Sequence, residues 1–273
     1  MSEALGTWID GVAGTNVPAD DRGLQYGDGL FETILVRGGT ARFLDAHFAR
    51  LARGCQRLGI AFSPGVLRAD LQLALPRATA SAVLKIVVTR GSAQRRGYAP
   101  QATTPARRIV SLWPSAETSA LESGVTLGIA STRAATNPAL AGLKHLNRLE
   151  NVLAAAEIPA GAFDVLMFDS GDRLISGSAC NVFIVRGGQI STPALESCGV
   201  AGVLRGIVQR EAGRLGMTVT ERALALTDVT GADEVFVTNA RIGVVPVRAV
   251  GEHSFRMTEL ATKLRAHIET LDA

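Results

Sequence analysis

The chain has 273 residues, of which 47% are hydrophobic and 19% are charged, so it is long and apolar enough for one large domain or two modest ones. The formal net charge is only +3 and there is no run of basic residues, which excludes the charge pattern typical of nucleic-acid binding. No stretch approaches the roughly 20 apolar residues that a membrane-spanning helix needs.

The three cysteines, Cys55, Cys180 and Cys198, are widely spaced and form no CxxC pattern. We therefore expect reduced thiols and no metal site. The N-terminal sequence MSEALGTWIDG lacks a basic segment followed by an apolar one, so no secretory leader is expected. Together these features predict a soluble, cytoplasmic protein that does not bind membranes.

The first 115 residues are expected to form an α/β domain. Asp10-Gly11 is a hairpin-turn signal, and Gly38-Gly39 ends a β-rich run. Asp45 is expected to cap a helix whose apolar residues recur at helical spacing and which Gly59 ends. The predicted strands are 7–9, 30–36, 82–89 and 108–113, and the predicted helices are 46–58 and 64–77.

A polar stretch without periodicity, residues 114–124, predicts a linker, which we place at residues 116–124. Residues 125–273 are expected to form a second domain with the larger, mixed sheet. The fold class is therefore α+β or α/β in two domains. The predicted strands of the second domain are 125–130, 165–169, 181–186 and 234–238, and its helices are 146–156, 202–215 and 257–271.

Lys144 is the most suggestive of only three lysines, the others being Lys85 and Lys263. It follows Gly142 and precedes a run whose leucines recur on one helical face. Partial burial among small and apolar residues makes an amine nucleophilic enough to form an imine. By position alone, an ordinary solvated lysine is the alternative.

Three segments offer groups for a phosphate. Arg50 lies three residues after His47 on one face of the predicted helix and offers a bidentate guanidinium. Residues 199–206 (GVAGVLRG) form a glycine-flanked turn that opens a helix, whose backbone N–H groups point towards an anion. Thr238 and Asn239 end a strand and have side chains that donate hydrogen bonds. A surface arginine, a plain capped helix and a plain turn are the alternatives.

Five runs resemble the fold-type IV pyridoxal-phosphate family in order and spacing. The resemblance covers nearly the whole chain and implies a two-domain fold, pyridoxal 5'-phosphate as cofactor and Lys144 as the imine-forming catalytic residue. It also implies that Arg50, Asn239 and the backbone amides of Val203 and Leu204 surround the cofactor phosphate. The runs are DRGLQYGDGLFETI (21–34), HFARL (47–51), LKHLNRLENVLA (143–154), ISGSACNVFIV (175–185) and GVAGVLRG (199–206).

This family includes branched-chain and D-amino-acid aminotransferases and 4-amino-4-deoxychorismate lyases. KHLNRLE (144–150) and LKIVVTRGSAQRRGY (84–98) resemble the lyases, which implies elimination of pyruvate to give 4-aminobenzoate, a folate precursor. The likeness places Arg96 and Tyr98 against the substrate, where an arginine suits two carboxylates. Glu32 and Thr33 are further candidates for lining the pocket, although Glu32 fits a strand-edge charge equally well.

Ser176 departs from the family pattern, in which this cofactor-binding position is usually Glu. A carboxylate there keeps the pyridine nitrogen of the cofactor protonated and makes the ring a strong electron sink. A serine hydroxyl can hydrogen-bond to the nitrogen but carries no charge. Because aromatisation of the product supplies its own driving force, Ser176 favours a lyase over an aminotransferase. It also leaves a weakened or altered activity open.

In the expected reaction the Lys144 amine removes the proton at C4 of the substrate ring. Lys144 or a water then protonates the enolpyruvyl methylene, and pyruvate leaves. The resemblance also implies a homodimer with the cofactor at the domain interface. Two alternatives stay open: an aminotransferase for D-amino or branched-chain amino acids, and a non-catalytic member that binds the cofactor or a partner protein.

Overall fold

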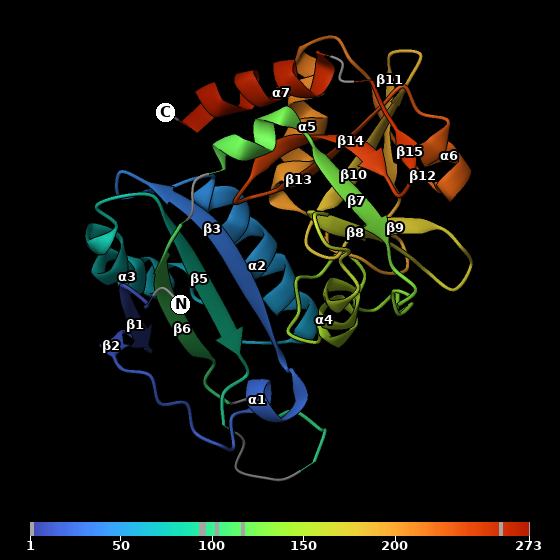
Figure 1. Ribbon diagram of the computed structural model, residues 1–273. Coiled ribbons are helices and arrows are strands. Elements are labelled where there is room, and N and C mark those ends of the chain that lie inside the picture. Colours follow the sequence, from blue (N-terminus) through green and yellow to red (C-terminus); the bar gives the residue numbers. More distant parts are fainter. Residues whose placement is uncertain (1–2, 93–96, 102–103, 116–117, 257–258, 273) are drawn as a thin grey trace. The chain divides into compact units, whose positions relative to one another are not determined.

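The structure is a computed structural model, and it describes the chain except for residues 1–2, 93–96, 102–103, 116–117, 257–258 and 273. The chain divides into two compact units (Figure 1). Unit 1 comprises Met1–Glu117 and Leu143–Asn147, and unit 2 comprises Thr118–Gly142 and Arg148–Ala273. The division after residue 117 lies within the predicted linker. The segment with Lys144, however, belongs to unit 1, whereas we expected it in the C-terminal domain.

Unit 1 is built on an antiparallel sheet. Within the described part of the chain, six strands lie in the order β2-β1-β6-β5-β3-β4 (Figure 1). Along β5 fully buried residues alternate with more exposed ones, as expected for a sheet with one covered face. The strands are β1 (Gly6–Ile9), β2 (Val12–Ala13), β3 (Gly29–Arg37), β4 (Thr40–Ala41), β5 (Ala82–Thr89) and β6 (Arg107–Pro114).

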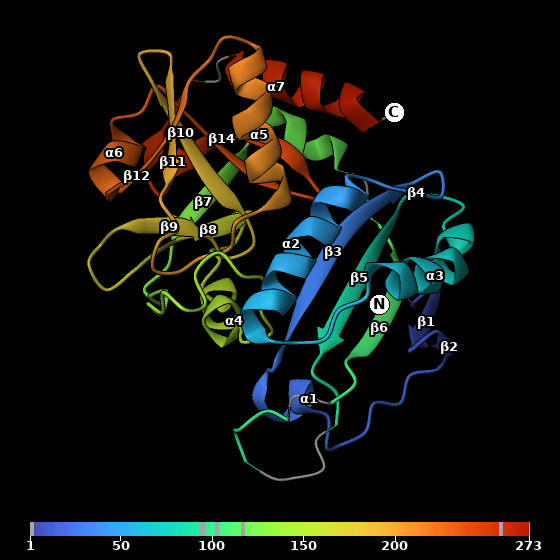
Figure 2. The same cartoon turned by 180° about the vertical axis from the view of Figure 1, so that it is seen from behind.

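Helices cover one face of this sheet, as Figure 2 shows for α2 (Leu44–Leu58) and α3 (Pro64–Ala74). Phe48, Leu51 and Cys55 on α2 are buried, because their spacing brings them to the face that packs on β3. Gly59 ends α2 in a left-handed conformation with φ 64°, as predicted. The helix begins two residues earlier than predicted. The remaining helical segments of unit 1 are α1 (Arg22–Tyr26) and η1 (Leu75–Arg77).

The segment Leu143–Asn147 extends the sheet of unit 1 beside β3. The Phe31 N–H donates to the Lys144 carbonyl at 2.9 Å, and the Leu146 N–H donates to the Gly29 carbonyl at 3.0 Å. These bonds hold the segment extended, so α4 (Leu149–Ala156) begins three residues later than predicted. Lys144 therefore lies in a strand-like segment and not directly before a helix.

Unit 2 is built on a larger mixed sheet. Among the described residues this sheet has nine strands (Figure 1). Eight of them lie in the order β12-β11-β10-β13-β14-β7-β8-β9, and β15 pairs with β14. Three of the pairings are parallel, β11 with β12, β14 with β7, and β7 with β8. The strands are β7 (Val125–Ile129), β8 (Asp164–Phe168), β9 (Leu174–Gly177), β10 (Asn181–Arg186), β11 (Gln189–Pro193), β12 (Val219–Arg222), β13 (Glu234–Asn239), β14 (Gly243–Val250) and β15 (His253–Ser254).

The core of unit 2 lies on this sheet. Phe183 of β10 and Phe236 of β13 are fully buried, and their parallel rings stack with centroids 4.8 Å apart. Helix α5 packs on β13 and α7 on β14, and the two helices pack on each other. The remaining helical segments are η2 (Ser119–Ser123), α5 (Val203–Arg214), α6 (Leu226–Thr230), α7 (Leu260–Glu269) and η3 (Thr270–Asp272).

No helix in the described part of the chain is both long enough and apolar enough to cross a membrane.

Candidate functional site

Lys144 is held by its backbone and by an aromatic ring. Its carbonyl is bonded to β3, as described above, and its Nζ lies 4.2 Å from the centroid of the Phe31 ring. A second ammonium group, Lys85 Nζ, lies 5.7 Å from the same centroid. Attraction between an ammonium group and the face of an aromatic ring stabilises both positions. The ammonium groups of Lys85 and Lys144, two of the three lysines in the chain, therefore both lie near the Phe31 ring.

Successive side chains of β3 point to opposite faces of the sheet. Phe31 and Thr33 lie on one face, and Lys85 is directly opposite Thr33 on the neighbouring strand β5. Sequence reasoning assigned no role to Lys85. The signal that marks it is a charged residue at an exposed position within an otherwise apolar strand.

Glu32 lies on the opposite face, beneath α2, and its side chain is only 1% exposed. The Nε of Arg50 donates to Oε1 at 2.8 Å, and Nη2 of Arg50 donates to Oε2. The Nδ1 of His47 lies 2.6 Å from the same Oε2. The Glu32 carboxylate is therefore engaged by Arg50 and His47.

The charges of this group are set by burial and by close contact. Burial opposes ionisation of Glu32, but the hydrogen bonds from Arg50 and His47 outweigh it and lower the pKa of Glu32 below its ordinary value. Burial lowers the pKa of His47, and the positive charges of Arg50 and Lys144 lower it further, against the attraction of Glu32. A neutral His47 that donates from Nδ1 and an ionised Glu32 therefore orient the Arg50 guanidinium.

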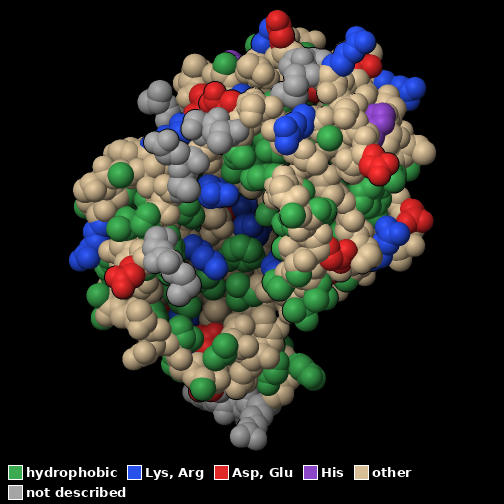
Figure 3. Space-filling view, viewed as in Figure 1, with side chains coloured by type: hydrophobic (Ala, Val, Ile, Leu, Met, Phe, Trp, Pro, Cys, Tyr) green, Lys and Arg blue, Asp and Glu red, His purple; other side chains and the backbone are tan. Residues whose placement is uncertain are grey.

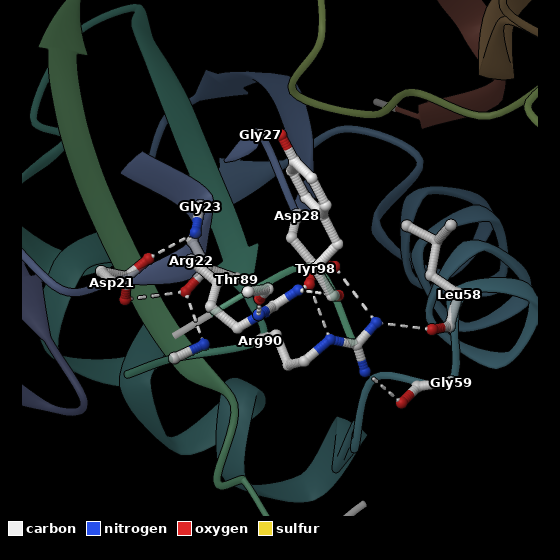
Figure 4. A network of polar contacts seen from close by, with 12 residues as sticks. Asp21, Arg22, Gly23, Gly27, Asp28, Leu58, Gly59, Thr89, Arg90 and Tyr98 are labelled. Carbon is white, nitrogen blue, oxygen red and sulfur yellow. Dashed lines mark hydrogen bonds and ion pairs between the residues drawn. The ribbon is translucent and has the colours of Figure 1, made fainter. Parts of the chain in front are cut away.

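Arg96 and Tyr98, two of the predicted substrate-binding residues, follow β5 in the chain. Arg96 lies outside the described residues. Tyr98 is 84% exposed, and its ring centroid lies 5.4 Å from that of Tyr26. Its carbonyl accepts a hydrogen bond from Arg22 (Figure 4).

In unit 2, the predicted phosphate turn opens α5. Val203 and Leu204 are its first two residues, and Gly202 precedes the helix in an extended conformation. The turn is tightly packed, since Asn181 donates from Nδ2 to the Val200 carbonyl at 2.9 Å. Backbone N–H groups at such an N-terminus, together with the helix dipole, favour an anion.

Thr238 and Asn239 stand side by side at the end of β13 but differ in their bonding. Thr238 is fully buried, and its Oγ1 has no hydrogen-bond partner among the described residues. Asn239 donates from Nδ2 to the Ala179 carbonyl and to Cys180 Sγ, while its Oδ1 accepts from the backbone. The side chain of Asn239 thus bonds to protein groups and closes the turn that follows β13.

Ser176 is half-buried in β9, where it pairs with Met167 of β8, and its Oγ donates to the Gly177 carbonyl at 2.7 Å. The turn that follows is held by Asp164, a residue that sequence reasoning missed. Its carboxylate accepts from the backbone N–H and the hydroxyl of Ser178 and from the N–H of Ala179. A single buried acid at the start of a strand offers no local signal of this role.

The chain matches the family model described as amino-transferase class IV over residues 29–250. The chain belongs to this family. It is 34% identical to an aminodeoxychorismate lyase from Vibrio harveyi over 96% of this chain and 99% of that protein. It is 30% identical to a D-alanine aminotransferase from Bacillus licheniformis over 86% of this chain and 83% of that protein.

A solved structure is also similar to this chain. The crystal structure of 4-amino-4-deoxychorismate lyase from Pseudomonas aeruginosa superposes with a TM-score of 0.92 and 42% sequence identity, covering 97% of this chain and 98% of that one. The predicted two-domain fold of the fold-type IV family is thereby confirmed.

Members of the class IV aminotransferase family depend on pyridoxal phosphate, which needs an amine for its carbonyl carbon and donors for its phosphate. Unit 1 contains an amine in Lys144 and an oriented guanidinium in Arg50. Unit 2 contains the N-terminus of α5 and the unpartnered, buried hydroxyl of Thr238. Within each unit, the groups present are of the kinds that this cofactor needs.

Proposed function

We propose that this protein is a pyridoxal-phosphate-dependent lyase that converts 4-amino-4-deoxychorismate into 4-aminobenzoate and pyruvate. The observation that carries the proposal is the similarity to the Pseudomonas aeruginosa lyase, 42% identity over 97% of the chain. The Vibrio harveyi lyase, similar over 96% of the chain, supports it. The run KHLNRLE at Lys144 points to the same branch of the family.

Each unit, taken by itself, offers groups of the kind that bind this cofactor. Lys144 would bind its carbonyl carbon, and Arg50, oriented by Glu32, would bind its phosphate. The backbone amides of Val203 and Leu204 and the Thr238 hydroxyl are further donors of the kind that bind a phosphate. The cofactor, when bound, supplies an electron-withdrawing ring that acidifies the carbon bearing the substrate amine.

Lys144 would carry the proton transfers. Its amine would remove the proton at C4 of the substrate ring. The same amine, or a water beside it, then protonates the methylene carbon of the enolpyruvyl group, and pyruvate leaves as the ring becomes aromatic. Phe31 restricts where the amine lies, because the ring packs against it at 4.2 Å.

The cations near Phe31 suit this substrate, which carries two carboxylates. Lys85 and Thr33 lie on the Phe31 face of the sheet, and Tyr98 is exposed in the same unit. We propose these residues, with Arg96, as the substrate-binding set. Ser176 is proposed to meet the pyridine nitrogen as a neutral hydrogen-bonding group. We also propose that the protein acts as a homodimer.

The experiment measures 4-aminobenzoate released from aminodeoxychorismate, by chromatography with fluorescence detection. Lys144→Ala should lower the rate by about 10³-fold, because proton transfer by a positioned group is lost. It should also lose the lysine–cofactor adduct that borohydride reduction traps. Lys263→Ala is the matched control, since Lys263 is exposed on α7 and forms an ion pair with Glu259 at the surface. A trapped adduct on another lysine in the Lys144→Ala protein contradicts the assignment.

One observation favours a second activity on the same residues: the 30% identity to a D-alanine aminotransferase. Incubation with D-alanine and 2-oxoglutarate distinguishes aminotransferase activity from lyase activity. Amino transfer that is fast while no 4-aminobenzoate forms from aminodeoxychorismate would exclude the lyase.

A further inference from the structure

Two buried arginines and a partly buried aspartate in unit 1 form a cluster to which the function proposed above assigns no role (Figure 4). We call Asp28, Arg22 and Arg90 the Asp28 cluster. The Asp28 carboxylate accepts from Nε of Arg22 at 2.8 Å and from Nε of Arg90 at 2.7 Å. Arg22 is 3% exposed and Arg90 is 6% exposed. Burial of such charges costs desolvation energy, which the hydrogen bonds of each guanidinium have to offset.

Arg22 uses its other two nitrogens on a single turn. Nη1 donates to the Gly97 carbonyl at 2.9 Å, and Nη2 donates to the Tyr98 carbonyl at 2.7 Å. A planar guanidinium with all three nitrogens engaged has one orientation. The backbone of the Gly97–Tyr98 turn is therefore tied to Asp28, although it lies 75 and 76 residues beyond Arg22 in the chain.

Arg90 binds the same carboxylate but holds a different element. Its Nη1 donates to the Gly59 carbonyl and its Nη2 to the Leu58 carbonyl, both at 2.7 Å. These carbonyls end α2, where a cation also meets the negative end of the helix dipole. Arg90 thus anchors a helix while Arg22 anchors the turn, which makes the two arginines a matched pair for an experiment.

The backbone beside Asp28 also holds the Lys144 segment. The Gly27 carbonyl accepts from Nδ2 of Asn147 at 3.2 Å, and the Gly29 carbonyl accepts from the Leu146 N–H at 3.0 Å. One short stretch of chain therefore positions the Lys144 segment through its carbonyls and the Gly97–Tyr98 turn through Asp28 and Arg22.

The side chain that this arrangement fixes is the exposed ring of Tyr98. The Tyr26 ring lies 5.4 Å from it, and the Arg22 guanidinium lies 4.9 Å above the Tyr26 ring. Arg22 therefore acts on Tyr98 from two directions, through its carbonyl and through Tyr26. An aromatic ring held in this way offers a large contact area at little cost in conformational entropy, which suits recognition.

We propose that Arg22 is a positioning residue for substrate recognition: oriented by Asp28, it fixes the Gly97–Tyr98 turn and so presents the Tyr98 ring. The proposal rests on the proposed function for the identity of the substrate. It assigns Arg90, by contrast, to the stability of α2 alone.

The first test observes Tyr98 directly, without substrate. The chain has only two tyrosines, so protein labelled with 3-fluorotyrosine should give two fluorine resonances, which Tyr98→Phe assigns. We expect Arg22→Gln to shift and narrow the Tyr98 resonance, because the turn is released. Arg22→Lys, which keeps the charge beside Asp28, should do so less. Arg90→Gln should leave the Tyr98 resonance in place and lower the melting temperature.

The second test is kinetic and uses the cofactor-loaded protein with aminodeoxychorismate. Arg22→Gln should raise KM about tenfold, as expected for the loss of well-formed charge-assisted hydrogen bonds, with kcat within about twofold. Arg22→Lys should recover part of this loss. In a Tyr98→Ala background, Arg22→Gln should add nothing further to KM, because both changes remove the same contact.

Three results would overturn the proposal: an unmoved Tyr98 resonance in both Arg22 variants, additive effects of Arg22→Gln and Tyr98→Ala on KM, or equal KM changes in Arg22→Gln and Arg90→Gln. The last would show that the whole cluster serves only stability. Failure of the proposed function looks different, since the wild-type protein would then form no 4-aminobenzoate while the resonance test still decides whether Arg22 holds Tyr98.

Discussion

Glu32 determines where the Arg50 guanidinium points, because it bonds two nitrogens of that guanidinium and is itself bonded by His47. The neighbouring residue Thr33 lies on the other face of β3. Residues adjacent in sequence thus serve different parts of unit 1. Sequence reasoning proposed Arg50 as a phosphate ligand but did not predict its contact with Glu32, since nothing local shows that Glu32 lies under α2.

Glu32→Gln should weaken pyridoxal-phosphate binding by about tenfold, because the group that orients Arg50 loses its charge. It should also destabilise the fold by about 3 kcal/mol, since the buried Arg50 cation loses the negative charge of its carboxylate partner. Absorbance titration with the cofactor and urea unfolding measure the two effects. Thr33→Val, on the opposite face of the same strand, is the control for both. Unchanged cofactor affinity in Glu32→Gln would contradict the role of the ion pair.

His47 makes stability depend on pH. Its pKa in the fold is lowered from 6.5 by burial, so between the lowered value and 6.5 the unfolded chain binds more protons than the folded chain. The free energy of unfolding therefore decreases as pH falls below 6.5, by at most about 1.4 kcal/mol per pH unit for this group.

Urea unfolding at about pH 7.5 and about pH 5.5 measures this dependence, within the range where histidine changes its charge. In His47→Gln, whose amide can still donate to Glu32, the free energy of unfolding should differ less between the two pH values than it does in the wild-type protein. If the two proteins show the same difference, another group is responsible.

Among the elements, those with a strong local pattern were predicted well. Strands β5 and β10 have the predicted bounds. Helix α2 ends at the predicted residue and begins two residues earlier, and α5 and α7 differ from their predicted bounds by one to three residues at each end. Strands β9, β11, β12 and β14 were not predicted. They are short or, in β14, contain Pro246 inside a buried strand, which local rules exclude.

The turn into α5 requires a glycine at position 202, because the Asn181 side chain lies very close to the Gly202 backbone. A Cβ at Gly202 would lie 2.0 Å from Oδ1 of Asn181, whose side chain holds the turn through the Val200 carbonyl. Gly202→Ala should therefore lower the free energy of unfolding by about 1–3 kcal/mol, the usual cost of overpacking. Because the N-terminus of α5 would shift, cofactor affinity should fall as well.

Gly206→Ala is the matched control in the same helix. A Cβ there meets no described atom within 4 Å, so the change should be neutral or stabilising by up to about 1 kcal/mol. Thermal unfolding and cofactor titration compare the two variants. Equal losses in both would show that the close approach at Gly202 does not matter.

At the scale of the whole molecule, the chain changes unit around Lys144. Gly142 bonds to Gly199 within unit 2, whereas Lys144 bonds to Phe31 within unit 1. The chain returns to unit 2 at Arg148. The formal net charge of the chain is +3, and both basic and acidic side chains are visible on the face drawn in Figure 3.

By itself, the sequence determined the elements with clear periodicity and the family, because each depends on residues that are close together or on runs of fixed order. Only the tertiary structure decided which residues these side chains and segments contact. Glu32 meets Arg50 and His47, Asn239 turns back onto Ala179, and Lys144 joins the sheet of unit 1. These contacts join residues 15 to more than 100 positions apart. Only folding brings such groups within hydrogen-bond range, so the side chain with which a charge is paired cannot be read from its neighbours in the chain.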